Sequence, residues 1–312
     1  MIRIGTRGSK LAIIQAEIVK EELLKNDQSL TIEIVKIITQ GDEQTILFNQ
    51  GIGVENNNNK KSFTKAIENE LIDGNIDIAV HSAKDLSVIM DDRLQLSATV
   101  IRGSPYDCLI SMNNYVIKNL PQNAKIGTSS IRRRLNLEYI RPDLQIELLR
   151  GNIDSRITKL IEGRFDAIIL ARSGVERLNL LEKSQKLFFN NIDISELIPS
   201  SNQGTIAMQT RVRDGEINTI CKQINCQKTW IRTKIERAVV RILNANCNTP
   251  LAVFASEVDE NGQCRVYVSY IHQEDGILIK KKYSQLILVD SFLQLSQKAI
   301  EDLQYIASQI EL

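Results

Sequence analysis

A lysine and an aspartate stand side by side where an apolar run of the sequence ends. In the stretch NIDIAVHSAKDL, residues 75–86, the run closes at Val80 and the charged pair follows at Lys84 and Asp85. An adjacent pair at a strand end is usually a surface ion pair worth under about 1 kcal/mol. In a cation-rich cleft, however, Asp85 becomes the acid/base group, and its carboxylate can stabilise a cationic intermediate. Lys84 would then contact an anionic ligand.

Further charged groups fall where strands are expected to end and helices to begin. They are Arg7, Asp42, Arg132, Arg133, Arg150, Arg156 and Arg177. A charge run such as SIRRRLNLEY is usually a solvated helix face. Here the run follows the hydroxyls of Thr128, Ser129 and Ser130, and hydroxyls, backbone N–H groups and guanidinium groups at a helix start form an anion site. Several such anion sites, contributed by the two halves of an expected two-lobed fold described below, predict a ligand with many carboxylates or phosphates.

An alternation of strands and helices would position these groups. Residues 2–4 and 31–39 read as strands, and Ser9 can cap a helix between them. A second helix ends near Gly74, before the strand described first. The stretch KIGTSSIRRRLNLEYIRP starts a second set, as a strand, a cap and a helix that Pro142 stops. This alternation predicts α/β folding with mostly parallel sheets, which bind ligands beyond the carboxyl ends of their strands.

The two sets look like weak internal repeats. Residues 4–6 and 126–128 both read Ile-Gly-Thr, and GNIDIAVHSAKD (74–85) matches GRFDAIILARSG (163–174) aspartate for aspartate. Chance similarity between two βα units, which share their composition anyway, is the alternative. As a repeat, the pattern predicts two similar α/β lobes.

The last part of the chain has a different pattern and predicts a smaller α+β domain. A helical pattern runs over 229–243, several strand-like runs follow, and a closing helix is expected from about residue 291 to 310. The predicted domains are 1–101 plus 200–221 for the first α/β lobe, 102–199 for the second, and 222–312 for the α+β domain.

Composition and charge exclude several classes of protein. The 39 basic and 38 acidic side chains give a net charge of +1, whereas a nucleic-acid-binding protein usually has a clear basic excess. No apolar run reaches membrane-spanning length, so we expect no membrane partner. The five cysteines show no zinc-binding spacing, so no metal site is expected, and a reduced cytoplasmic protein is the simplest interpretation.

Cys247 lies in LNANCNTPL, a short polar segment between a predicted helix and a strand. Free cysteines are most often inert core residues. The asparagines and the proline around Cys247 favour a turn and exposure, which a covalent attachment needs. On composition alone, attachment is the less frequent of the two outcomes.

Taken together, the motifs resemble those of the hydroxymethylbilane synthase (porphobilinogen deaminase) family. They are IGTRGSKLAIIQA, QGD, DIAVHSAKDL, IGTSSIRRRLNL, LLRGNIDSR, DAIILARSGVERL and ERAVVRILNANCNTPLAVFA, in register to about Ala255. The resemblance implies a transferase of tetrapyrrole, and hence porphyrin and heme, biosynthesis. Such an enzyme joins four porphobilinogen molecules head to tail into hydroxymethylbilane and releases ammonia at each addition.

The resemblance also implies a cofactor and assigns site residues. It implies a dipyrromethane, thioether-linked to Cys247, and a catalytic Asp85 in a monomeric, cytoplasmic enzyme. The cofactor-binding residues implied are Cys247, Lys84, Asp85, Thr128, Ser129, Ser130, Arg132, Arg133, Arg150, Gly151 and Lys60. The substrate-binding residues implied are Arg7, Ser9, Asp42, Arg150, Arg156 and Arg177. Arg132 and Arg133 are expected to matter more to cofactor assembly than to stability.

Three segments depart from the family pattern. The stretch GVENNNNKKSFTK, with Lys60, stands where the family has a glycine-rich segment. Ala245 and Asn246 replace a glycine pair before the cysteine, and Asn202 replaces another glycine. Alanine tolerates left-handed backbone poorly, so the segment before Cys247 is expected to differ in shape or stability.

Two alternatives to the enzyme remain open at the level of the sequence. The lobes are expected to be periplasmic-binding-protein-like, and folds of this kind also serve as solute receptors, so a non-enzymatic two-lobed anion-binding protein is the first. The amino terminus has no long apolar segment, which disfavours a periplasmic receptor. A nucleic-acid binder that uses SIRRR is the second, and the near-zero net charge disfavours it.

Overall fold

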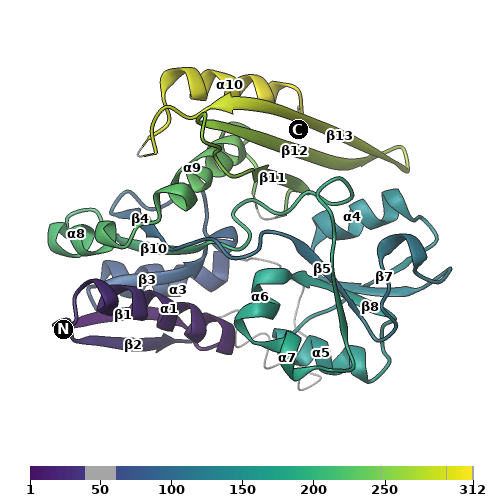
Figure 1. Ribbon diagram of the computed structural model, residues 1–312, viewed down its shortest axis with the longest axis horizontal. Helices are drawn as coiled ribbons and strands as arrows, with labels where there is room; N and C mark the ends of the chain where they lie inside the picture. The colour runs from purple at the N-terminus through teal and green to yellow at the C-terminus, as the bar shows by residue number, and fades with distance from the viewer. Residues whose placement is uncertain (39–60, 247, 293, 311–312) are drawn as a thin grey trace. The chain divides into compact units, whose positions relative to one another are not determined.

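The computed structural model describes residues 1–38, 61–246, 248–292 and 294–310 (Figure 1). By compactness the chain forms two units, Met1–Arg102 with Thr205–Trp230, and Gly103–Gly204 with Ile231–Leu312. The three-domain division that the sequence suggests stays a prediction. Among the described helices, none combines the length and apolar character that crossing a membrane requires.

The first unit is built on a five-stranded sheet in the order β2-β1-β3-β10-β4. Its strands are β1 (Ile2–Arg7), β2 (Ile32–Ile37), β3 (Ile78–Ser82), β4 (Leu94–Thr99) and β10 (Ile206–Arg211). Its helices are α1 (Lys10–Asn26), α3 (Lys61–Ile72), the short 3-10 turn η1 (Ala83–Asp85) and α8 (Gly215–Gln223). β1 runs parallel to β2 and β3, and β10 runs antiparallel to β3 and β4, so four of the five strands point the same way.

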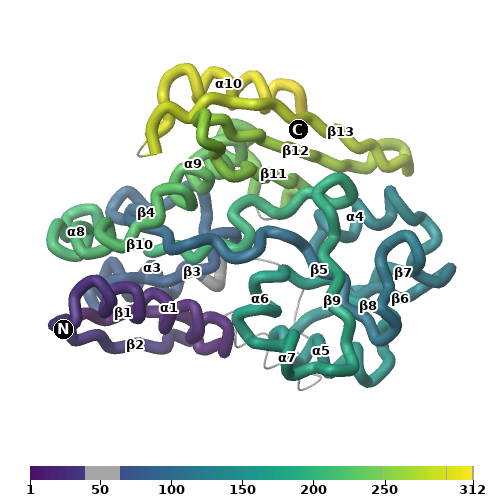
Figure 2. The backbone as a smooth tube through the Cα atoms, viewed as in Figure 1, coloured from purple at the N-terminus to yellow at the C-terminus, as the bar shows by residue number. Residues whose placement is uncertain are grey.

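The second unit contains a five-stranded sheet of the same design, in the order β7-β6-β8-β5-β9. Its strands are β5 (Asp107–Ser111), β6 (Lys125–Thr128), β7 (Gln145–Leu148), β8 (Ala167–Ala171) and β9 (Phe188–Asn191). Its helices are η2 (Ile117–Asn119), α4 (Ile131–Ile140), α5 (Ile153–Ile161), α6 (Arg172–Arg177) and α7 (Leu180–Lys183). Again one strand, β5, runs antiparallel to its neighbours. In the first sheet the antiparallel strand comes from a distant part of the chain, as the green β10 beside the blue β3 and β4 shows (Figure 2).

The registers of the two sheets confirm the internal repeat. Ile4 pairs with Ile78 in the first unit, and Ile126 pairs with Ala167 in the second, which are the positions that the sequence match equates. The matched aspartates also make the same contact, because Asp77 accepts from the backbone N–H of Arg3 at 2.9 Å, and Asp166 accepts from that of Lys125 at 2.7 Å. The prediction of two similar, mostly parallel α/β lobes is therefore confirmed.

A third sheet belongs to the second unit, in the order β11-β12-β13. Its strands are β11 (Leu251–Ala255), β12 (Gln263–Glu274) and β13 (Ile277–Leu288), all antiparallel. Helices α9 (Gln227–Ile242) and α10 (Gln297–Ser308) supply apolar residues to the core that covers this sheet, among them Ile235, Val239 and Leu303. The predicted α+β element of the fold is thus present.

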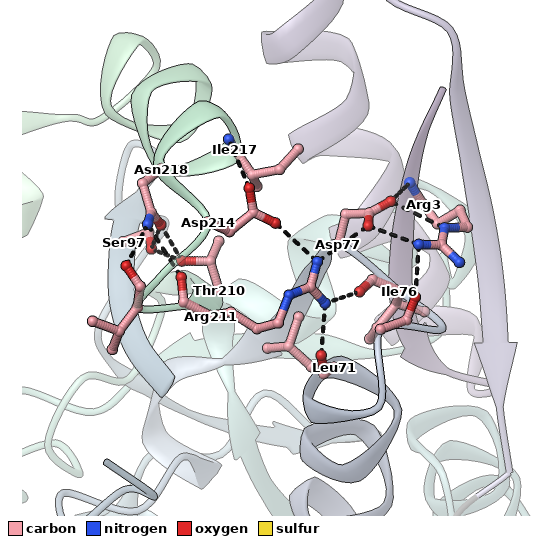
Figure 3. A network of polar contacts seen from close by, with 12 residues as sticks. Arg3, Leu71, Ile76, Asp77, Ser97, Thr210, Arg211, Asp214, Ile217 and Asn218 are labelled. Atoms are coloured by element: carbon pink, nitrogen blue, oxygen red, sulfur yellow. Dashed lines mark hydrogen bonds and ion pairs between the residues drawn. The ribbon is translucent and has the colours of Figure 1, made fainter. Parts of the chain in front are cut away.

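Arg211, at the end of β10, links this strand to helix α3 and to the segment before β3 through a polar network (Figure 3). Its guanidinium donates at 2.6 Å to the carbonyl oxygens of both Leu71 and Ile76, and to Asp214 at 2.8 Å. Because Arg211→Met leaves both carbonyl groups without this donor, we expect a loss of about 1–3 kcal/mol in the free energy of unfolding. Urea denaturation measures it, with the exposed Arg213→Met as the control; equal stability of the two variants would contradict the assignment.

Candidate active site

The charged pair follows β3, whose residues are packed on both faces. Ile78 and Val80 belong to the apolar cluster with α1, and Ala79 belongs to the cluster with α3. The chain then makes the single turn η1. This burial leaves the end of β3 little freedom to move within its lobe.

The turn η1 is anchored by apolar residues on either side of the charged pair. Ala83 and Leu86 are buried, and the N–H of Ala83 donates to the carbonyl oxygen of Thr205 at 3.0 Å. Lys84 and Asp85 are half-buried. Buried neighbours and a backbone hydrogen bond therefore fix the backbone of the turn, while these two charged side chains remain in contact with solvent.

Arg7 and Ser9 lie at the same edge of this sheet as the charged pair. β1 and β3 are parallel neighbours, so their carboxyl ends meet at one edge. Arg7 is the last residue of β1 and half-buried, and Ser9 caps α1 by accepting from the N–H of Ala12 at 3.4 Å. The structure thus brings together four of the predicted site residues, Arg7, Ser9, Lys84 and Asp85.

The corresponding edge of the second lobe carries hydroxyl groups. Thr128 ends β6, and its side-chain oxygen accepts from the N–H of Ser130 at 3.2 Å. Ser130 in turn caps α4 by accepting from the N–H of Arg133 at 3.4 Å. Ser129, between them, is exposed. The predicted helix start is confirmed, and Ser129 presents a hydroxyl to solvent there.

Cationic side chains surround the turn that follows the neighbouring strand β7. Arg150 and Gly151 form this turn, and Gly151 has a φ of 109°, which favours glycine. From α5, Arg156 donates to the carbonyl oxygen of Gly151 at 2.7 Å, and Lys159 donates to that of Arg150 at 3.0 Å. Because β6 and β7 are parallel, this turn shares its sheet edge with Ser129.

Lys159 is a candidate that the motifs did not identify. Burial, followed by the charges of Arg164 and Arg156, lowers the pKa of its ammonium group. Lys159 lies three residues after Arg156 on the same helix, and this one-turn spacing is the sequence signal that could have found it.

Arg132 and Arg133 are buried, contrary to the expectation of open guanidinium groups at a helix start. Both guanidinium groups donate hydrogen bonds to the buried carboxylate of Asp107. Arg132 makes one bond of 2.7 Å, and Arg133 makes two, of 3.0 and 2.7 Å. They also donate to the carbonyl oxygens of Ile198 and Ile169, at 2.7 and 2.8 Å. Since breaking a buried ion pair costs about 3–5 kcal/mol, the sequence alone underestimates their part in stability.

Asp107 titrates well below its ordinary range. Burial alone would raise the pKa of this carboxyl group, but the charges of Arg132 and Arg133 and the hydrogen bond from Gln203 together lower it to about 2. Asp107 therefore stays ionised at neutral pH. Its two arginines are held as one buried cluster of charge within the second unit.

Arg177 donates a hydrogen bond where two chain segments of the second unit, at Gly103 and Gly204, approach each other closely. Its guanidinium donates to the carbonyl oxygen of Gly204 at 2.6 Å, and Gly204 accepts there from the N–H of Gly103 as well. A Cβ atom at Gly204 would lie 2.4 Å from the carbonyl oxygen of Gly103, so only glycine fits. Burial lowers the pKa of Arg177 to about 10.

Three predicted site residues, Asp42, Lys60 and Cys247, lie outside the described residues. The segment directly before Cys247 is described, and its alanine does not adopt the left-handed backbone. The left-handed backbone falls on Asn244, with a φ of 47°, while Ala245 is buried in the apolar core and has no such φ. Asparagine tolerates this conformation better than other residues with a Cβ atom.

Two α/β lobes of one design, each with charged side chains at the carboxyl edge of its sheet, define the chain as a two-lobed α/β protein. Residues 2–219 match the family model described as porphobilinogen deaminase, dipyromethane cofactor binding domain. The chain belongs to the porphobilinogen deaminase family, so it is a transferase whose cofactor is dipyrromethane.

Known relatives support the same family over most of the chain. The porphobilinogen deaminase of Rickettsia prowazekii is 42% identical over 260 residues, which cover 83% of this chain and 84% of that one. The porphobilinogen deaminase of Ehrlichia canis is 36% identical over 304 residues, 97% of this chain and 98% of that one. Among solved structures, the periplasmic VFT2 domain of Bordetella pertussis BvgS aligns with a TM-score of 0.43 at 14% identity, over 72% of this chain and 86% of that one.

Proposed function

We propose that this protein condenses four porphobilinogen molecules stepwise into hydroxymethylbilane, with release of ammonia at each addition. The reaction is primed by a dipyrromethane that is thioether-linked to Cys247. The observation that carries this proposal is the turn η1, where buried Ala83 and the buried following residue Leu86 hold the half-buried Lys84 and Asp85 at the carboxyl edge of the sheet. The setting suits an acid/base group for an anionic substrate.

The side chains at the two sheet edges suit the charge of the cofactor and the substrate. Each pyrrole unit carries an acetate and a propionate, and guanidinium and ammonium groups pair with carboxylates, bidentately in the case of arginine. We assign this role to Arg7, Ser9 and Lys84 in the first lobe, and to Thr128, Ser129, Ser130, Arg150, Gly151, Arg156 and Lys159 in the second. Burial is the main cause of the lowered pKa of Lys159, and the neighbouring cations Arg164 and Arg156, which lower it further, favour an anionic ligand there.

Asp85 acts on the substrate as ammonia leaves. When the bond between the methylene carbon and nitrogen breaks, the electron pair departs with the nitrogen, and positive charge develops on the pyrrole and its methylene group. The Asp85 carboxylate stabilises this charge. After the new carbon–carbon bond has formed, a carboxylate oxygen of Asp85 accepts the proton that leaves the pyrrole α-carbon. The dipyrromethane supplies the pyrrole to which the first unit is joined.

Three of the other four cysteines support the choice of Cys247, because their burial makes them unsuited to attachment. Of the four described cysteines, Cys108, Cys221 and Cys264 are buried. Burial raises the pKa of Cys108 to about 11 and that of Cys221 to about 12, so both stay protonated thiols at neutral pH, and the thiolate is the reactive form. The flanking residues Asn246 and Asn248 are exposed.

The remaining assignments complete the proposal. Arg132, Arg133 and Lys60 serve cofactor binding, with Arg132 and Arg133 also holding the second lobe together through Asp107. Asp42 and Arg177 serve the substrate. We propose a monomeric, cytoplasmic enzyme that needs neither nucleic acid nor a membrane.

Product formation tests the proposal. Incubation with porphobilinogen is expected to consume four molecules for each hydroxymethylbilane and to release four of ammonia. Both yields can be measured in one reaction mixture, by chromatography and by an ammonia assay. Tight binding of porphobilinogen without its consumption would instead favour the anion-binding protein.

A further inference from the structure

A buried histidine lies four residues before Asp85, on the face of β3 that packs against α3. His81 is 5% exposed. Ala79 belongs to the apolar cluster with Ile67 and Leu71 of α3, and the alternation of side chains along a strand puts His81 on the same face. His81 stands within the motif DIAVHSAKDL, but the mechanism proposed above assigns its imidazole no role.

A chain of hydrogen bonds holds the imidazole. His81 Nε2 lies 3.1 Å from Oε1 of Gln209, a fully buried residue of β10. The amide nitrogen of Gln209 donates to Oε1 of Glu68 at 3.0 Å and contacts the sulfur of Met90 at 3.6 Å. The chain therefore connects three neighbouring elements of the first lobe, β3, β10 and α3.

This chain also defines which ring nitrogen carries the proton. A carboxylate can only accept hydrogen bonds, so Glu68 orients the Gln209 amide with its NH2 group toward Glu68 and its oxygen toward the His81 ring. That oxygen can only accept as well, so Nε2 of His81 must carry a hydrogen and Nδ1 must be the bare nitrogen. Burial lowers the pKa of His81 to about 4, although Gln209 and Asp85 act in the opposite direction, so the ring is neutral at neutral pH.

A second brace holds the next residue from the other side of the sheet. Ser82 and the buried Gln15 of α1 are joined through the Gln15 amide, with Nε2 and Oε1 at 2.9 and 3.0 Å from the hydroxyl. The last two residues of β3 are thus held from opposite faces, immediately before the turn η1.

We propose that His81 is a positioning residue for Asp85. Its neutral imidazole, clamped by Gln209 and Glu68, fixes the strand end that carries the catalytic carboxylate. The proposal rests on the role proposed for Asp85. A reacting group displaced by about 1 Å can lose as much as 100-fold in rate, so loss of the clamp should lower kcat while KM changes little.

The tautomer can be observed directly, because the chain has two histidines, His81 and His272. Nitrogen-15 NMR of the cofactor-loaded enzyme, with His272→Gln to assign the signals, should show a neutral ring protonated at Nε2 through the range of ordinary histidine titration. A ring protonated at Nδ1, or one that titrates near pH 6.5, would overturn the clamp.

Kinetics test the consequence for Asp85. In His81→Gln the side-chain amide can still donate to Gln209, whereas His81→Phe fills the space without a donor. We expect kcat to fall at least about tenfold in His81→Phe with KM within about twofold, and His81→Gln to recover most of the loss. His272→Gln is the matched control and should keep the wild-type kcat.

Two results would overturn the positioning role. They are a wild-type kcat in folded, loaded His81→Phe, and equal losses in His81→Gln and His81→Phe, which would indicate packing alone. If His81→Phe does not fold, Glu68→Ala tests the same series of hydrogen bonds at its other member, the half-buried Glu68. An unchanged kcat in that variant counts against the proposal. Wild-type protein and Asp85→Asn are assayed beside them, so failure of the proposed function is recognised separately by wild-type protein that forms no product.

Discussion

Asp85→Asn is expected to give a folded protein that still carries the cofactor but turns over about 10²–10⁴ times more slowly than wild type. The amide has nearly the shape of the carboxylate, and buried Ala83 and Leu86 anchor the backbone on either side of the charged pair. The substitution therefore removes the negative charge and the proton acceptor but not the backbone geometry. Single-turnover measurements with porphobilinogen give the rate.

Two companion measurements keep this result interpretable. Thermal unfolding of Asp85→Asn should match that of wild type, which separates chemistry from stability. Asp92→Asn, which removes an exposed carboxylate seven residues further on, is the matched control and should keep full activity. Near-normal product formation by Asp85→Asn would remove Asp85 from the catalytic role.

Asp107→Asn is expected to lower the free energy of unfolding by about 3–5 kcal/mol, because it leaves two buried guanidinium groups without their counter-charge. Asp107 is fully buried, and Arg132 and Arg133 each approach it to 2.7 Å. Urea denaturation measures the loss. Asp143→Asn, which breaks the partly exposed pair with Arg141, is the control and should cost under about 1 kcal/mol. Equal losses would show that burial of the cluster adds nothing.

The same carboxylate predicts a pH dependence of stability. The pKa of Asp107 is about 2 in the folded protein and about 3.9 in an unfolded chain, so folding favours the ionised form. The resulting stabilisation is present above pH 4 and is lost as the pH falls from about 4 through 2. Urea denaturation between pH 2 and 6 should show this loss in wild type and a weaker one in Asp107→Asn. Parallel pH profiles would contradict it.

Local pattern was sufficient to predict the lobes and the strand ends. Apolar runs and the helix caps Ser9 and Ser130 are encoded within a few residues of sequence, and the repeat follows from matched aspartates that make matched contacts. The position of Lys84 and Asp85 at a sheet edge follows from the apolar run that closes at Val80, just before β3 ends at Ser82. These features depend on neighbours in the sequence, so the sequence predicts them.

Contacts between distant residues could not be predicted in this way. Arg132 and Arg133, on helix α4, read as an exposed charge run because their partner, Asp107, lies about 25 residues earlier, on strand β5. His81 and Gln209 are 128 residues apart, and no local pattern joins them. Asn202, which the sequence comparison with the family pattern had singled out, has a left-handed φ of 59°, and asparagine tolerates this conformation better than other residues with a Cβ atom.

The intact mass of the purified protein under denaturing conditions, beside a Cys247→Ser control, tests the central claim most directly. Wild type is expected to exceed the mass of the bare chain by two linked pyrrole units, and Cys247→Ser is expected to show the bare mass. An identical excess in both proteins would contradict attachment at Cys247. A bare mass for wild type that persists after incubation with porphobilinogen would contradict the covalent cofactor and with it the proposed reaction.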